Sequence, residues 1–147
     1  MKIRRKVKSL IQEYKTNNPF ELIEHLDISL VIYPMAGNIN GYYVEQFDVQ
    51  SICINSELND DERTIVAAHE LGHAVLHKNQ NSVFISKKTF FSQDKLEKQA
   101  DIFAAELLLD DSVFSQYHGY SLEYISQCEC VSSKLVEYKL DNLINRI

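Results

Sequence analysis

The sequence contains little glycine and proline, and it has no long hydrophobic run. Only 4 glycines and 2 prolines occur among the 147 residues, which excludes collagen-like and low-complexity proteins. No stretch approaches the roughly 18 apolar residues that a membrane-spanning helix requires. The first eight residues are locally basic, but no apolar run of the length of a signal sequence follows them. We therefore expect a cytoplasmic protein that has no membrane partner.

Cationic residues are also in deficit. Lysine and arginine total 15 against 21 aspartates and glutamates, and the formal net charge is −6. Because contacts to phosphate need lysine and arginine, an acidic chain is a poor candidate for direct binding to nucleic acid or to an anionic membrane. The hydrophobic fraction of 45% and the charged fraction of 24% are ordinary for a globular protein. The length predicts a single domain over residues 1–147.

Cysteines are few and odd in number, so they do not form a disulfide framework. Cys128 and Cys130 flank Glu129 and could supply half of a metal site, but no second Cys or His pair lies at zinc-finger spacing. The preferred interpretation is that these two residues and Cys53 are free thiols in a reducing compartment.

The pattern of hydrophobic residues predicts an α+β fold, with a sheet in the N-terminal part and helices after it. Helical periodicity and capping residues predict four helices, over residues 1–15, 19–26, 59–77 and 94–109. β-rich segments predict three strands in a small antiparallel or mixed sheet, over residues 28–33, 40–45 and 50–54.

Two further segments complete the expected organisation. Residues 78–93 are polar and should form a loop or a loose hairpin, and residues 112–147 should form two or three short helices. The sequence therefore predicts a catalytic core over residues 28–109 and a helical tail over residues 112–147.

The segment His69-Glu70-Leu71-Gly72-His73 lies within the helix predicted over residues 59–77. Residues four apart share one helix face, so His69 and His73 can direct two imidazoles to one point, as a tetrahedral zinc ion needs. Glu70 is turned by about 100° from His69, and it can take a proton from a metal-bound water without binding the metal itself. The helix is apolar nearly all round, and buried histidines and glutamate are costly unless something satisfies them. A Zn²⁺ ion would do so; the alternative is that both histidines are only hydrogen-bonded.

A catalytic zinc ion usually has three protein ligands and one open position. Glu97, in the second strong helix, is the best candidate for the third ligand. Asp101, four residues later on the same face, would accept a hydrogen bond from the far ring nitrogen of a ligand histidine and fix its tautomer. The alternative for Glu97 is a capping box with Asp94. Glu106 lies about 180° around the same helix from Glu97, so the two cannot both face one metal ion.

Two other histidines offer further candidates. His77 extends the series of His69 and His73, but three histidines in line along a straight helix cannot converge on one ion. It is expected near the helix C-terminus, where positive charge is favoured. His118 either donates to a developing oxyanion or belongs to a surface aromatic cluster, and the cluster is the preferred interpretation.

Two motifs occur in a specific order along the chain. The first is Ala67-Ala68-His69-Glu70-Leu71-Gly72-His73-Ala74-Val75-Leu76-His77, and the second is Glu97-Lys98-Gln99-Ala100-Asp101-Ile102-Phe103-Ala104-Ala105-Glu106-Leu107-Leu108. Together they resemble the ImmA/IrrE family of zinc-dependent peptidases. Weaker similarities lie in four short segments: Gly41-Tyr42, Ile52-Cys53-Ile54-Asn55, Val131-Ser132-Ser133 and Tyr138-Lys139-Leu140.

The resemblance implies a zincin-like fold in which His69, His73 and Glu97 hold zinc and Glu70 is the catalytic base. Members of the family are commonly encoded in phages, integrative elements or stress-response systems. They cut a helix-turn-helix repressor and so relieve repression. No helix-turn-helix region precedes the peptidase segment here, so the repressor is expected to be a separate protein.

The chain departs from the family pattern at the end of the second motif. The family usually has a proline after the run of leucines there. In this sequence Leu107-Leu108-Leu109 is followed by Asp110-Asp111, so the exit from the second helix is expected to differ.

Three functions follow from these features. In the first, the protein is a peptidase, Glu70 is its base, and an extended substrate pairs with an exposed sheet edge from residues 40–54. In the second, it is a metal-containing binding module that controls a repressor by stoichiometric contact; Glu70 argues against this, because a structural site needs no base. In the third, the C-terminal helices bind DNA through Lys134, Lys139 and Arg146, which is thin evidence in an acidic chain.

Overall fold

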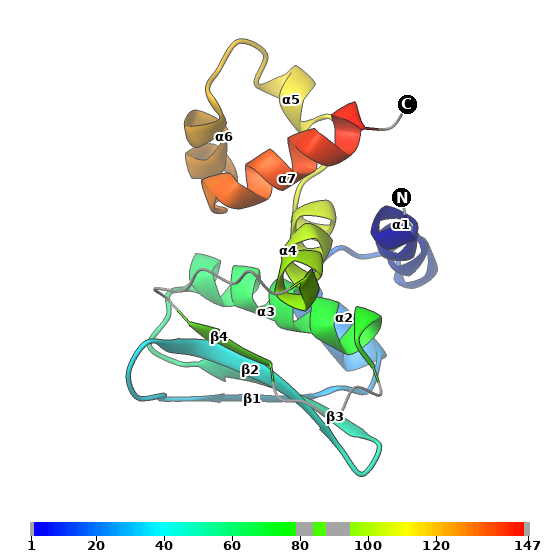
Figure 1. Ribbon diagram of the computed structural model, residues 1–147, viewed down its shortest axis with the longest axis vertical. Coiled ribbons are helices and arrows are strands. Elements are labelled where there is room, and N and C mark those ends of the chain that lie inside the picture. Colours follow the sequence, from blue (N-terminus) through cyan, green and yellow to red (C-terminus); the bar gives the residue numbers. More distant parts are fainter. Residues whose placement is uncertain (1, 79–83, 88–94, 146–147) are drawn as a thin grey trace.

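The computed structural model describes residues 2–78, 84–87 and 95–145. Two helices precede three strands, one further strand lies between the next two helices, and only helices follow it in the described residues (Figure 1). In chain order the elements are α1 (Lys2–Tyr14), α2 (Pro19–His25), β1 (Ser29–Tyr33), β2 (Ile39–Gln46), β3 (Val49–Asn55), α3 (Asp60–Leu76), β4 (Phe84–Lys87), α4 (Lys95–Leu108), α5 (Val113–Gln116), α6 (Leu122–Glu129) and α7 (Ser133–Ile144). This confirms the predicted α+β fold, and three of the four strands precede α3 as expected.

The four strands form one mixed sheet in the order β1-β3-β2-β4. β1 is parallel to β3, whereas β2 is antiparallel to both β3 and β4. β4 lies within residues 78–93, for which a loop or a loose hairpin is predicted. Residues 84–87 form a strand that pairs with β2, so a plain loop is wrong there. The other residues of this segment from 79 onward lie outside the described part of the chain.

The expectation that residues 40–54 provide the exposed sheet edge for the substrate is also wrong. Residues 40–54 form most of β2 and β3, which are the two inner strands. The described edges are β1 and β4, and every residue of β1 is exposed. Hydrogen bonds between strands far apart in the sequence decide which strand is at the edge, and the pattern within each strand does not show them.

α3 packs on one face of this sheet (Figure 1). Asn59 caps the helix by accepting a hydrogen bond from the backbone N–H of Glu62 at 2.9 Å. The residues of the core shared by α3 and the sheet are fully buried: Tyr43, Ile52, Ile54, Ala67, Ala68 and Leu71. Gly41 permits this close approach, because a Cβ atom there would lie 2.6 Å from the carbonyl oxygen of Cys53 and 2.8 Å from Val66 Cγ1.

α3 also contacts α4 closely, and Gly72 is the reason. A Cβ atom at Gly72 would lie 3.1 Å from Ala100 Cα and 3.1 Å from Phe103 Cβ. Ala100, Phe103 and Ala104 are fully buried at this contact. The lack of a side chain at position 72 therefore lets the backbones of the two helices approach, which brings residues of α4 beside the histidines of α3.

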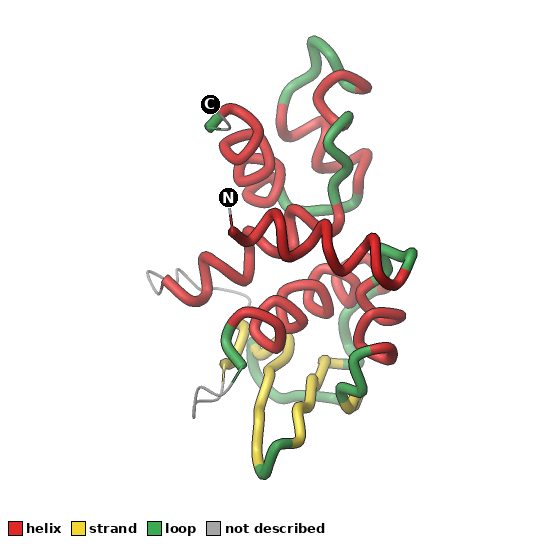
Figure 2. Tube along the Cα trace, turned by 90° about the vertical axis from the view of Figure 1, so that its right-hand side faces the viewer, coloured by secondary structure: helices red, strands yellow, loops and turns green. Residues whose placement is uncertain are grey.

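The helical tail lies at the end of the molecule remote from the strands (Figure 2). It contains α5, α6 and α7, as the two or three short helices predicted over residues 112–147. A small second hydrophobic cluster holds them together, formed by Leu109, Val113, Ile125 and Val136. None of the helices in the described ranges combines the length and hydrophobicity needed to cross a bilayer.

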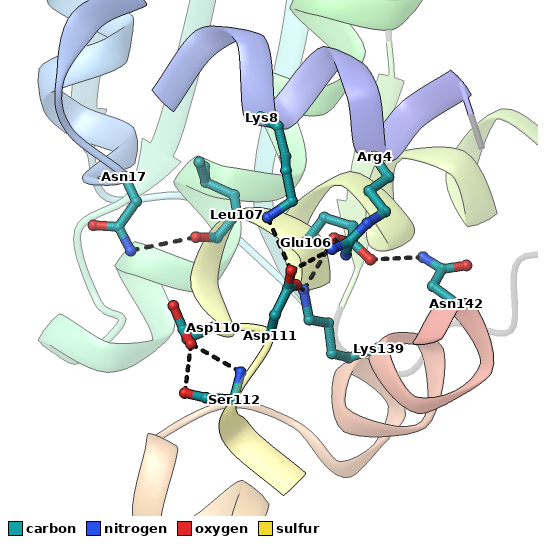
Figure 3. Close-up of polar contacts among 10 residues, drawn as sticks. All are labelled: Arg4, Lys8, Asn17, Glu106, Leu107, Asp110, Asp111, Ser112, Lys139 and Asn142. Atoms are coloured by element: carbon teal, nitrogen blue, oxygen red, sulfur yellow. Dashed lines mark hydrogen bonds and ion pairs between the residues drawn. The ribbon is translucent and has the colours of Figure 1, made fainter. Parts of the chain in front are cut away.

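Buried charges connect the tail to α4 and α1 (Figure 3). Lys139 Nζ lies 3.0 Å from Glu106 Oε2 and 2.8 Å from Asp111 Oδ1, and its side chain is 1% exposed. This argues against the third hypothesis, in which Lys139 contributes to a DNA-binding surface, because a lysine buried among carboxylates cannot reach a phosphate. Of its two proposed companions, Lys134 lies 3.4 Å from Asp101 Oδ2, and Arg146 is outside the described residues.

Candidate metal centre

α3 places three potential metal ligands on its buried part. His69, Glu70 and His73 each offer one ligand atom, and these atoms lie within 4.8 Å of one another. The exposed fractions are 8% for His69 and 0% for both Glu70 and His73. Such polar groups are stable in a packed core only when partners or a bound ion satisfy them.

Glu97 of α4 lies against both histidines. Its Oε2 atom is 2.9 Å from His69 Nε2, and its Oε1 atom is 2.9 Å from His73 Nε2. Each carboxylate oxygen therefore faces one imidazole nitrogen, and the three side chains meet at one place. The alternative capping box cannot be compared directly, because Asp94 lies outside the described residues.

Asp101 lies one helical turn after Glu97 and contacts the far side of the His69 ring. Its Oδ1 atom is 2.8 Å from His69 Nδ1. A carboxylate can only accept, so Nδ1 carries the proton of this hydrogen bond. The other carboxylate oxygen of Asp101 lies 3.4 Å from Lys134 Nζ at the surface.

The two histidines have opposite electrostatic surroundings. Burial by itself would lower the pKa of His69, but hydrogen bonds to Asp101 and Glu97 outweigh it and raise the pKa to about 10. Burial dominates at His73 and lowers its pKa. Burial would raise the pKa of Glu97, but the hydrogen bonds from the two histidines lower it to about 2. In the metal-free protein the proton on His69 thus offsets part of the negative charge of the two carboxylates.

His77 follows α3 and contacts the other side of His73. The Nδ1 atoms of His73 and His77 lie 2.9 Å apart, and His77 Nε2 lies 2.9 Å from Gln99 Oε1. His77 is near the helix C-terminus, as expected, but it is 2% exposed and belongs to the same buried cluster. Gln99 belongs to no pattern of ligands in the sequence; its position between Glu97 and Asp101 is the only sequence signal for a role at the centre.

A divalent metal ion fits this donor set. Two imidazole nitrogens and one carboxylate are the typical protein ligands of a catalytic zinc ion. The far nitrogen of each ring already has a hydrogen-bond partner, as is usual for histidines that bind metal. The ion would take the place that the proton on His69 occupies in the metal-free protein.

A family model described as the IrrE N-terminal-like domain, Peptidase_M78, matches residues 23–141. The chain belongs to this peptidase family. The match covers the sheet, the two helices of the candidate centre and most of α7.

Two relatives extend the comparison within this family. The "Uncharacterized immunity region protein 2" of Bacillus phage phi105 is 42% identical over 139 residues, which are 93% of this chain and 88% of the relative. "Metallopeptidase ImmA" of Bacillus subtilis (strain 168) is 32% identical over 145 residues, which are 96% of this chain and 85% of the relative. The family and this relative support a metallopeptidase that has a protein substrate.

The remaining candidates of the sequence analysis lie away from this centre. Glu106 is buried on α4, but its partners are Arg4, Lys139 and Asn142. His118 is exposed between α5 and α6, a segment remote from α3 in Figure 1. Tyr120 and Tyr124 stack nearby, with ring centroids 4.4 Å apart, which favours the surface aromatic cluster.

Among the described residues, the metal-ligand cluster includes none of the cysteines. All three are free thiols; Cys53 is buried, and Cys128 and Cys130 are exposed. This agrees with the preferred interpretation of the sequence.

Proposed function

We propose that this protein is a zinc-dependent endopeptidase that cleaves a helix-turn-helix repressor in the cytoplasm and so relieves repression of a phage, a mobile element or stress genes. One observation carries the proposal: His69 Nε2 and His73 Nε2 face the two carboxylate oxygens of Glu97 at 2.9 Å each. The names of the two relatives, a phage immunity region protein and a metallopeptidase, favour a repressor as substrate.

In this proposal His69, His73 and Glu97 hold the metal ion. Bound there, zinc would supply Lewis acidity toward the scissile carbonyl and toward the attacking water. Asp101 positions His69, because its carboxylate accepts a hydrogen bond from Nδ1–H and leaves Nε2 facing the centre.

Glu70 is the proposed general base. It follows His69 directly on α3 and is fully buried next to it. Its carboxylate would accept a proton from the attacking water as the new C–O bond forms, and then donate it to the departing amine as the C–N bond breaks. The products are a free carboxyl group and a free amino group, so the reaction needs no further reactant.

The substrate would bind as an extended segment along a sheet edge. Of the two described edges, β4 is the one that we assign to the substrate. α3 contacts β4 as well as β2 and β3, whereas β1 lies at the opposite side of the sheet. Pairing with β4 would therefore place a peptide on the side of the sheet nearer to the candidate base.

Metal analysis and a cleavage assay test the proposal together. Wild-type protein should contain zinc, and His69→Ala and Glu97→Ala should lose it. Glu70→Gln should retain zinc but cleave the repressor encoded beside the gene at least about 100-fold more slowly. Glu62→Gln is the matched control, because it makes the same change at an exposed position of α3 and should leave cleavage unchanged.

Two outcomes would overturn the mechanism. If the wild-type protein neither contains nor accepts zinc, the proposed metal centre is wrong. If Glu70→Gln cleaves as fast as the wild type, Glu70 is not the general base. Relief of repression without fragments, by wild type and Glu70→Gln alike, would instead establish the stoichiometric binding module.

A further inference from the structure

His73 and His77 form a buried pair at the end of α3. Their Nδ1 atoms are 2.9 Å apart, and the residues are 0% and 2% exposed. The backbone N–H of His77 also donates to the carbonyl of His73 at 2.9 Å, which ends the helix. The two rings are thus held together by both main-chain and side-chain hydrogen bonds.

Two imidazole nitrogens at this distance can share only one proton, so one ring donates and the other accepts. Distance alone does not decide the direction. If His77 donated, His73 Nδ1 would accept, and a neutral His73 would carry its proton on Nε2. That nitrogen faces Glu97 Oε1 at 2.9 Å, and a protonated nitrogen cannot bind a metal ion.

Gln99 supplies the direction. Its Oε1 atom lies 2.9 Å from His77 Nε2, and an amide oxygen can only accept. His77 Nε2 therefore carries the proton, and the lone pair of a neutral His77 is on Nδ1. Once a metal ion replaces the contact between His73 Nε2 and Glu97 Oε1, the lone pair of His73 is on Nε2, and its Nδ1–H donates to His77 Nδ1.

We propose that Gln99 and His77 are positioning residues that fix the tautomer of His73, as Asp101 fixes that of His69. The proposal rests on the proposed function, because it assigns a role toward His73 as a metal ligand. It explains why a glutamine from α4 lies against a histidine that is not among the proposed metal ligands. Both ligand histidines then present Nε2 to the same point. The carboxylate of Asp101 orients His69, and the neutral pair His77 and Gln99, called the relay below, orients His73.

Substitutions at Gln99 separate the relay from simple packing. Gln99→Met keeps the length of the side chain but removes the acceptor. Gln99→Glu restores an acceptor at the same place and should rescue the relay. His77→Phe keeps an aromatic ring and removes both nitrogens. Gln99 is only half-buried, so its variants are expected to fold.

The ¹⁵N NMR signals of the histidine rings test the direction in zinc-loaded protein. We expect His77 to be protonated on Nε2 and unprotonated on Nδ1 in wild type and in Gln99→Glu, with that preference lost in Gln99→Met. Zinc affinity, measured by competition with a chelator, should fall about 10- to 100-fold in Gln99→Met and His77→Phe and recover in Gln99→Glu. A role limited to packing would lower the melting temperature without changing the tautomer.

The proposed role of His77 and Gln99 and the proposed peptidase function can be refuted separately. If His77 of the wild type carries its proton on Nδ1, or if Gln99→Met binds zinc as tightly as wild type, the relay is wrong even when cleavage is normal. If the wild type accepts no zinc, the proposed function fails. The ring signals of the metal-free protein then still test whether His77 donates from Nε2 to Gln99.

Discussion

Lys139 of α7 donates a hydrogen bond to Glu106 of α4 at 3.0 Å, and both side chains are 1% exposed. Arg4 of α1 donates to the same carboxylate at 2.7 Å, and Asn142 donates to its other oxygen at 3.1 Å (Figure 3). Asp111 joins the network through contacts with Lys139 and Arg4. The network therefore ties the first helix and the tail to α4.

Removal of Lys139 should destabilise the protein strongly. Lys139→Met leaves the buried Glu106 with fewer charged partners, and breaking a buried ion pair in this way costs about 3 kcal/mol. Urea denaturation of the two proteins measures the difference. The matched control is Lys134→Met on the same helix, where the lysine side chain is 52% exposed and the expected loss is below about 1 kcal/mol. Similar losses in the two variants would show that the buried network contributes little.

The same network predicts a loss of stability in acid. Hydrogen bonding from Arg4, with smaller contributions from Lys139 and Lys8, lowers the pKa of Asp111 against the opposing effect of burial. The folded state therefore binds this proton less tightly than the unfolded state. The resulting stability is present above the unfolded pKa of about 3.9, and it is lost as the pH falls from there through the folded value.

Asp111→Asn tests this dependence. Its urea midpoint should decline less than that of the wild type between about pH 5 and about pH 2. Asp141→Asn, at an exposed position of α7, is the control and should keep the wild-type decline. Parallel curves for wild type and Asp111→Asn would contradict the prediction.

Gly72 sets the distance between α3 and α4, so Gly72→Ala should be destabilising. Alanine in a helix is intrinsically favoured over glycine by about 1 kcal/mol. Here its Cβ atom would press on Ala100 and Phe103 at 3.1 Å, and overpacking costs about 1–3 kcal/mol. We expect a net loss in thermal denaturation and weaker zinc binding, since α4 carries Glu97. A variant more stable than the wild type would show that the helices separate without cost.

Zinc binding should release a proton. In the metal-free protein burial lowers the pKa of His69. The hydrogen bonds to Asp101 and Glu97 outweigh burial and raise this pKa to about 10. The ring is therefore protonated near neutral pH and must lose that proton before Nε2 can bind a metal ion. Calorimetry in two buffers of different protonation enthalpy should show release of about one proton or more, and an apparent affinity that rises with pH. Binding without proton release would mean that His69 is already neutral.

Local patterns were sufficient for the helices and for most of the strands. The cap at Asn59 and the apolar periodicity of α3 depend on residues within a few turns, so they are visible in the sequence. The spacing of Glu97 and Asp101 also follows from helix geometry alone, and the structure places both carboxylates beside His69. The edge strand could not be predicted, because β4 pairs with β2 across about forty intervening residues.

By itself the sequence determined that two histidines share one face of a buried helix and that two carboxylates share one face of another. Only the tertiary structure decided that these faces meet, because the meeting depends on Gly72 at the contact between the helices. It also decided that Lys139 is buried and that Gln99 reaches His77. Burial and hydrogen-bond partners are properties of packed neighbours that are distant in the sequence, and no local pattern encodes them.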